Sequence, residues 1–302
     1  MFIDFFGKES CVTMRKDHLL PGLAAVGGAL GFVLRRWQWA AYDPEAQLFS
    51  NGHPAGLLLL LLTGVLALAF LLLTRDLRAP EEELPWACPL TGWMTAMTAA
   101  ALLFALGGLL SLLEGMSQLP LSRAAPDTHP IAYPIALLLC GGLTMLSAGS
   151  SLMLGRACYR GRRDPALSML VLAPAFAALA WVFACHMEHS TDPILWNYGP
   201  VLAAAILLQL AHYEAAAAFH RGPHPRVWAF FALTGSAVGV MALGDGGTSA
   251  RTPILAAMIL SALAGVWPML RICYGPPLPP PGERMPVRAQ EDEDDDDDRL
   301  DF

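Results

Sequence analysis

Long apolar runs separated by short polar connections dominate the sequence. A bilayer core about 30 Å thick needs about 20 apolar residues when they form a helix. Seven runs meet or approach that length with few interior charges. They cover residues 54–74, 91–113, 130–155, 165–185, 198–220, 227–244 and 253–270. The pattern therefore predicts at least seven transmembrane helices.

An eighth span is predicted near the N-terminus, where an apolar run over residues 19–34 ends on Arg35 and Arg36. Continuing the helix beyond the arginines gives a span over residues 19–41 with the pair in its outer third. A cleaved signal peptide would have a similar core, but arginines directly after the core oppose translocation there. We expect the span to be retained. The sequence thus predicts an all-α, polytopic integral membrane protein with eight transmembrane helices.

The composition supports a membrane protein, because 55% of the residues are hydrophobic and only 15% are charged. Soluble proteins average about 45–50% apolar and about 25% charged residues. The formal charge of −7 is misleading, since residues 291–302 alone contribute −8. The membrane body is almost neutral and has no basic stripe, so nucleic-acid binding is not expected.

The predicted organisation has three parts: a cytoplasmic N-terminal segment over residues 1–18, a membrane domain over residues 19–271, and residues 272–302. The last part begins with a proline-rich spacer, which is typically extended and stiff. The acidic run that follows cannot bury a core and is expected to be solvated. It is either a docking site for a cytoplasmic protein partner or a solubilising terminus.

The distribution of Lys and Arg predicts the orientation in the bilayer. Positively charged residues are enriched in cytoplasmic connections. With eight spans, 15 of the 19 Lys and Arg lie in the N-terminal segment, the even-numbered connections and the C-terminal tail. Only four lie in the odd-numbered connections. Both termini are therefore predicted to be cytoplasmic.

Arg35 and Arg36 are two of those four exceptions. A charge inside a span costs about 2.5–3.5 kcal/mol on insertion scales, so it normally faces a partner or water. Glu114, Glu188 and Asp245 lie at the outer ends of other spans and could pair with either arginine. Alternatively, the arginines extend to the outer headgroups beside neighbouring tryptophans. We expect pairing for Arg35 and the headgroup position for Arg36.

A second group of polar residues lies in the inner half of the sixth span, where His212 and Glu214 accompany Gln209 and Tyr213. Gln209 and Tyr213 are four residues apart and share a helix face. Such a set of donors and acceptors could serve a proton or a quinone. Alternatively, Glu214 is near enough to the cytoplasmic end to reach water or Arg221.

His186 and His189 at the outer end of the fifth span are weak candidates for metal ligands. They are three residues apart and share a face if the helix continues. Together with Glu188 or His129 they would supply ligand types that divalent metals accept. The simpler interpretation is a polar helix end at the interface, so no metal is assigned.

No enzymatic motif is present. The sequence contains no P-loop, Rossmann glycine pattern, HExxH or GxSxG, and no connection is long enough to hold a catalytic domain. The six cysteines form no CxxC pair, so neither a disulfide framework nor a thiolate metal site is indicated. We therefore assign no catalytic residue and no cofactor.

Residues 27–38 (GGALGFVLRRWQ) and the Asp-Pro-Glu that starts at Asp43 form a recognisable opening. Together with the rest of residues 24–75, they resemble an uncharacterised multi-span membrane protein family of anaerobic Gram-positive bacteria. That family has no established activity, so the resemblance implies no catalytic residue. It does imply a bacterial plasma membrane and a retained first span.

Three functional hypotheses follow from the sequence. The first is a non-catalytic membrane component that binds a partner through its tail or arginine loops. The second is a transporter of a small solute, for which Glu214 and the Arg35 cluster are the intramembrane charges. The third is a quinone-linked membrane anchor of an oxidoreductase, which rests on the span count alone.

Overall fold

A computed structural model of the chain describes ten stretches of the sequence. These are residues 15–43, 45, 48–49, 53–78, 91–124, 131–159, 166–189, 195–222, 224–246 and 250–275. The predictions for residues 1–14, His129 and the acidic run lie outside the described residues.

Eight long helices make up nearly all of the described part, and each is apolar enough to cross a membrane. They are α1 (Lys16–Trp39), α2 (Pro54–Leu73), α3 (Thr91–Ala124), α4 (Ala132–Tyr159), α5 (Ala166–Glu188), α6 (Leu195–Arg221), α7 (Pro225–Ala242) and α8 (Arg251–Tyr274). A 3₁₀ turn, η1 (Leu243–Asp245), follows α7. The prediction of an all-α protein with eight membrane-spanning helices is confirmed.

A short hairpin is the β-structure seen in the described residues. β1 (Tyr42–Asp43) pairs antiparallel with β2 (Leu48–Phe49) in the connection between α1 and α2. The rings of Tyr42 and Phe49 face each other across the two strands, with their centroids 5.2 Å apart. The hairpin thereby closes over the end of α1.

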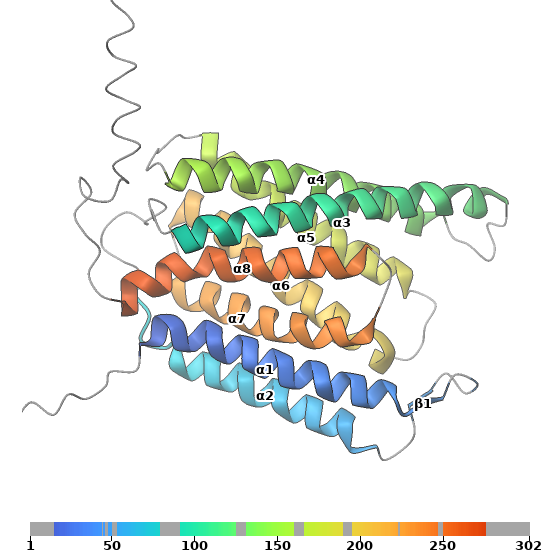
Figure 1. The fold of residues 1–302 in the computed structure, drawn as a ribbon, viewed down its shortest axis with the longest axis horizontal. Helices are drawn as coiled ribbons and strands as arrows, with labels where there is room; N and C mark the ends of the chain where they lie inside the picture. The colour runs from blue at the N-terminus through green and yellow to red at the C-terminus, as the bar shows by residue number, and fades with distance from the viewer. Residues whose placement is uncertain are drawn as a thin grey trace, which may run out of the picture.

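α3 is longer than its apolar run predicts. The expected span ended at residue 113, before Glu114, whereas the helix continues to Ala124. Hydropathy ends a span at the first charge, but backbone hydrogen bonding does not. Figure 1 shows this end of α3 projecting past the neighbouring helices.

The helices run roughly parallel or antiparallel to one another in a single bundle (Figure 1). α1 and α2 lie along one side, α3 and α4 along the opposite side, and α7 and α8 between them. In the most apolar windows of α7 and α8, 72% of the residues are buried, against 17% in α2. α7 and α8 are therefore central, while α2 presents most of its leucines to lipid.

The beginning of α1 and the end of α8 meet at one end of the bundle, here called the proximal end. The Lys16 ammonium lies 5.1 Å from the centroid of the Tyr274 ring, and the His18 ring lies 6.5 Å from Trp267. The opposite end, where α1 leads into the β-hairpin, is called the distal end. The beginning of α1 and the end of α8 therefore lie on the same side of the bundle.

α3 and α4 approach closely because glycines face each other at their crossing. A Cβ atom on Gly108 would lie 2.9 Å from the Gly141 carbonyl oxygen. A Cβ atom on Gly141 would lie 2.9 Å from the Gly108 carbonyl oxygen. Small residues allow backbones to approach in this way in membrane bundles. This contact holds α4 against α3, so that the two helices form one wall of the protein interior.

Candidate functional site

Arg35 is the centre of a buried polar cluster at the distal end. Its side chain is 0% exposed and forms an ion pair with Asp245, whose side chain is 4% exposed. The guanidinium also donates to Gln38 Oε1 at 2.7 Å and to the carbonyl oxygen of Asn197 at 2.8 Å. The cluster therefore ties α1 to η1 and to the beginning of α6.

Aromatic rings cover this cluster. The Trp39 indole N–H donates to Asp245 Oδ1 at 2.9 Å. The Arg35 guanidinium carbon lies 5.4 Å from the centroid of the Trp39 ring and 5.5 Å from that of Phe49. Water is thereby kept from the ion pair, which strengthens the attraction within it.

The structure selects one of the three acids considered for Arg35. Asp245 is the partner, whereas Glu114 and Glu188 belong to a different cluster. Arg36 is exposed on α1. Hydropathy alone could not distinguish the three acids, because it does not give the packing order of the helices.

A second ion pair at the distal end joins Glu188, the last residue of α5, to Arg251, the first residue of α8. Their side chains are 24% and 11% exposed. Both line a cavity of about 20 Å³, which we call the distal cavity. Its other polar and aromatic walls are Ser111, Tyr133, Cys140, Trp181 and Cys185.

Glu114 lies beside this cavity. The Tyr133 hydroxyl donates to Glu114 Oε1 over 3.5 Å. The other carboxylate oxygen, Oε2, is buried and has no hydrogen-bond partner within the described part of the chain. Glu114, Glu188 and Arg251 therefore place two negative charges and one positive charge around one small space.

A second space, the proximal cavity, lies deeper in the bundle and has a volume of about 40 Å³. Five helices line it: α3, α4, α5, α6 and α8. The lining residues that carry polar groups are Trp93, Ser150, Ser151, His212 and Ser261. The cavity therefore combines hydroxyls and an imidazole with apolar walls, as is common for ligand pockets.

His212 is 5% exposed, and both of its ring nitrogens are engaged. Nδ1 lies 2.7 Å from the Leu208 carbonyl oxygen, and Nε2 lies 2.8 Å from Ser261 Oγ. A carbonyl oxygen can only accept, so Nδ1 carries the proton. The contacts with Leu208 and Ser261 fix the ring at the cavity wall, and the Ser261 hydroxyl also donates to the Met258 carbonyl oxygen at 3.2 Å.

Small polar side chains on one face of α4 connect the levels of the two cavities. Cys140 lines the distal cavity, Thr144 and Ser147 follow, and Ser151 lines the proximal cavity. Spacings of four, three and four residues place them on one helix face. Thr144 and Ser147 are both 0% exposed, so this row of side chains faces the protein interior rather than lipid.

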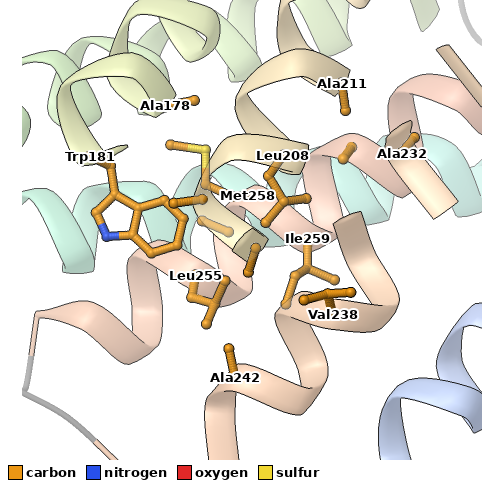
Figure 2. Packing of buried hydrophobic residues seen from close by; sticks show 14 of the residues in the cluster. Ala178, Trp181, Leu208, Ala211, Ala232, Val238, Ala242, Leu255, Met258 and Ile259 are labelled. Atoms are coloured by element: carbon orange, nitrogen blue, oxygen red, sulfur yellow. The ribbon is translucent and has the colours of Figure 1, made fainter. Parts of the chain in front are cut away.

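A tightly packed layer separates the two cavities. On α8, Ile254 lines the distal cavity and Ser261 the proximal one, so about 10 Å of helix lies between them. Met258 lies midway on the same face. Figure 2 shows Met258 of α8 among Trp181 of α5 and Leu208 of α6, and all three side chains are buried.

The polar residues of α6 do not form one site. His212 faces the proximal cavity, whereas Tyr213 is 43% exposed on the outside of the bundle. Glu214 lies 3.5 Å from the His224 ring in the connection to α7, which is at the proximal end. Glu214 therefore lies near the proximal end of α6, whereas His212 lines the proximal cavity.

The two candidate metal ligands on α5 point to different surroundings. The His189 ring packs against Tyr198 with 4.8 Å between centroids and lies 3.8 Å from Glu188. His186 is exposed. Within the described residues, no three His, Cys, Asp or Glu side chains are close enough together to hold a metal ion.

Sequence reasoning missed Arg251, Tyr133, Ser261 and the polar face of α4. Arg251 was counted only as an outer-loop charge, although it is the partner of Glu188. The spacing of Cys140, Thr144, Ser147 and Ser151 was a usable signal, because hydroxyls at helical period in a span indicate an interior face. Nothing in the sequence indicated which helices would face that row.

The chain was also compared with known proteins. No protein-family model, curated protein or solved structure matches it. The functional conclusion therefore rests on the arrangement of these side chains.

Proposed function

We propose that the protein is a transporter for a small polar solute. The observation that carries the proposal is a pair of cavities that lie at two depths of the helix bundle and have polar side chains in their walls. The row of small polar side chains on α4 runs from one cavity to the other. The packed layer around Met258 closes the space between them. This is the arrangement expected of an occluded pathway.

The free-energy cost of burying charged groups in a membrane supports this proposal. Ionisable side chains within membrane-spanning segments commonly mark solute or ion pathways, because burying a charge there is costly. Transporters also bind solute near the middle of the bilayer and expose it to one side at a time. In this conformation the layer around Met258 blocks passage, so transport requires a second state in which α8 or α5 has moved.

Neither the quinone-linked anchor nor the non-catalytic membrane component accounts for the two cavities. A haem or quinone site would need a ligand with a free donor or acceptor, whereas both nitrogens of His212 are engaged by Leu208 and Ser261. A purely structural membrane component gives no reason for polar cavities inside the bundle. Partner binding by the acidic run of residues 291–302 remains a prediction.

Transport across the bundle is expected to stop when the proximal cavity is filled. Ser151→Leu places an apolar side chain in that cavity, whereas Gly149→Leu adds the same side chain on the lipid face of α4, where an added Cβ meets nothing within 4 Å. Both proteins are reconstituted into vesicles. Osmotic swelling is then followed with glycine, tetramethylammonium, methanesulfonate and erythritol.

We expect wild type and Gly149→Leu to admit at least one of these solutes, and Ser151→Leu to behave like protein-free vesicles. The thermal melting of both variants controls for folding. If no solute enters faster through wild type than through protein-free vesicles, the transporter proposal fails.

We further propose that the membrane is a bacterial plasma membrane and that the proximal end faces the cytoplasm. The proximal end carries Arg15, Lys16, Arg75, Arg78, Arg156, Arg226 and Arg271. At the distal end, Arg35 and Arg251 are held in ion pairs inside the protein, which leaves Arg36 and Arg123 as the distal basic residues without one among the described residues. This asymmetry favours a cytoplasmic proximal end.

Fusions at the C-terminus test this orientation. Green fluorescent protein fused after Phe302 is expected to fluoresce, because the fusion partner folds in the cytoplasm. Alkaline phosphatase at the same position is expected to be inactive, since it needs an oxidising compartment. Active phosphatase together with a dark fluorescent fusion would reverse the proposed orientation.

A further inference from the structure

We propose that the distal cavity binds a small zwitterion that carries one ammonium and one carboxylate group, such as a glycine-sized amino acid. This inference rests on the proposed transport function and names the solute class for it. The ion pair of Glu188 and Arg251 is the feature that carries it, because both partners line the cavity. Each can therefore turn from the other toward a ligand.

A simple ion can pair with only one partner of the Glu188–Arg251 pair and leaves the other partner without its counter-ion. A cation that approaches Glu188 also meets Arg251, and an anion that approaches Arg251 also meets Glu188 and Glu114. Like charges at such distances are repelled strongly in a desolvated space. A molecule with both charges satisfies both residues. Binding then exchanges one ion pair within the protein for two between protein and ligand.

Geometry supports the orientation of such a ligand. An arginine binds a carboxylate through two parallel N–H···O bonds, so Arg251 is the residue for the carboxylate end. The ammonium end would face Glu188 and the rings of Tyr133 and Trp181, which line the same cavity. Aromatic faces attract ammonium groups. The Tyr133 hydroxyl also links this end to Glu114.

The size of the cavity limits the ligand. At about 20 Å³ in this conformation, the cavity has room for about one water molecule, so a ligand enters only when Glu188 and Arg251 separate. Trp181 and Ile254 form its inner wall and are buried, so the space cannot extend inward without the motion that transport requires. We therefore expect glycine or alanine to bind more tightly than larger amino acids.

Binding is tested on the purified protein in detergent by calorimetry and thermal melting, with glycine, methylamine and acetate as probes. Glycine is expected to bind and to raise the melting temperature, whereas methylamine and acetate are not. Glu188→Gln/Arg251→Gln removes both charges of the pair together, so neither partner is left as an unpaired ion. We expect this variant to lose at least about tenfold in glycine affinity.

Ser151→Leu serves as the matched control, because it changes the proximal cavity and leaves the distal one intact. It is expected to bind glycine like wild type while the swelling signal is lost. Equal binding of glycine and methylamine, or unchanged glycine affinity in the double variant, overturns the zwitterion site. Swelling with another solute in the absence of glycine binding leaves transport standing and overturns this inference alone. Glycine binding without flux of any solute leaves the zwitterion site standing and overturns the transport proposal.

Discussion

Asp245→Leu is expected to lower the free energy of unfolding by about 3–5 kcal/mol, because it leaves the Arg35 guanidinium buried without its counter-ion. Arg35 is 0% exposed, and the rings of Trp39 and Phe49 cover it. Neither water nor lipid headgroups can therefore replace the lost carboxylate. Arg35→Met is expected to cost a similar amount, since it leaves Asp245 unpaired. Thermal and chemical unfolding in detergent measure both effects.

Two further variants make this prediction specific. Arg35→Met/Asp245→Leu removes both charges, and apolar replacement of a whole buried pair is often neutral or stabilising. The double variant is therefore expected to be more stable than either single variant. Arg36→Met, at the neighbouring exposed position, is expected to change stability by less than about 0.5 kcal/mol. The role given to the pair is wrong if Asp245→Leu is as stable as Arg36→Met.

The second large effect is expected at the crossing of α3 and α4. Gly108→Ala places a methyl group 2.9 Å from the Gly141 carbonyl oxygen and the Met145 nitrogen. Backbone atoms cannot turn aside as a side chain can, so the helices must separate. Overpacking of this kind typically costs about 1–3 kcal/mol. Thermal and chemical unfolding are expected to show a clear loss of stability. Solute flux through the proximal cavity is expected to fall as well.

Gly142→Ala is the matched control for this crossing. Gly142 is the next residue after Gly141 on α4, and an added Cβ there meets nothing within 4 Å. Alanine is the better helix former by about 0.5–1 kcal/mol, so the substitution is expected to stabilise slightly. A loss of stability for Gly108→Ala together with a gain for Gly142→Ala would establish the close crossing of α3 and α4. Equal effects would show that the two helices are not in backbone contact.

The sequence predicted the number and approximate positions of the membrane helices well, because hydropathy and length are properties of each helix by itself. It failed at the end of α3, where the helix continues past Glu114 to Ala124. The reason is physical: a charge ends the apolar run, yet it does not interrupt the hydrogen bonds of a helix that projects into the interface.

The distal ion pairs show where prediction from sequence stops. The pattern identified Arg35 as a residue in need of a partner and reduced the choice to Glu114, Glu188 and Asp245. The choice among them depends on which helices are neighbours, and that is set by side-chain packing such as the glycine contacts. Arg251 paired with Glu188 was overlooked for the same reason.

The residues of α6 show the same limit. Gln209 and Tyr213 can share a helix face, whereas Glu214 lies about 100° further round the helix. His212 of the same helix lines the proximal cavity, and its partner Ser261 comes from α8, 49 positions further along the chain. Sites assembled from several helices in this way cannot be derived from spacing within one helix.

The claim that the two cavities form a solute pathway is tested most directly by the swelling of vesicles that contain Ser151→Leu or Gly149→Leu. A pathway through the bundle predicts that Gly149→Leu admits solute like wild type and that Ser151→Leu admits no more than protein-free vesicles. Equal flux through the two variants, with both proteins folded, would contradict it.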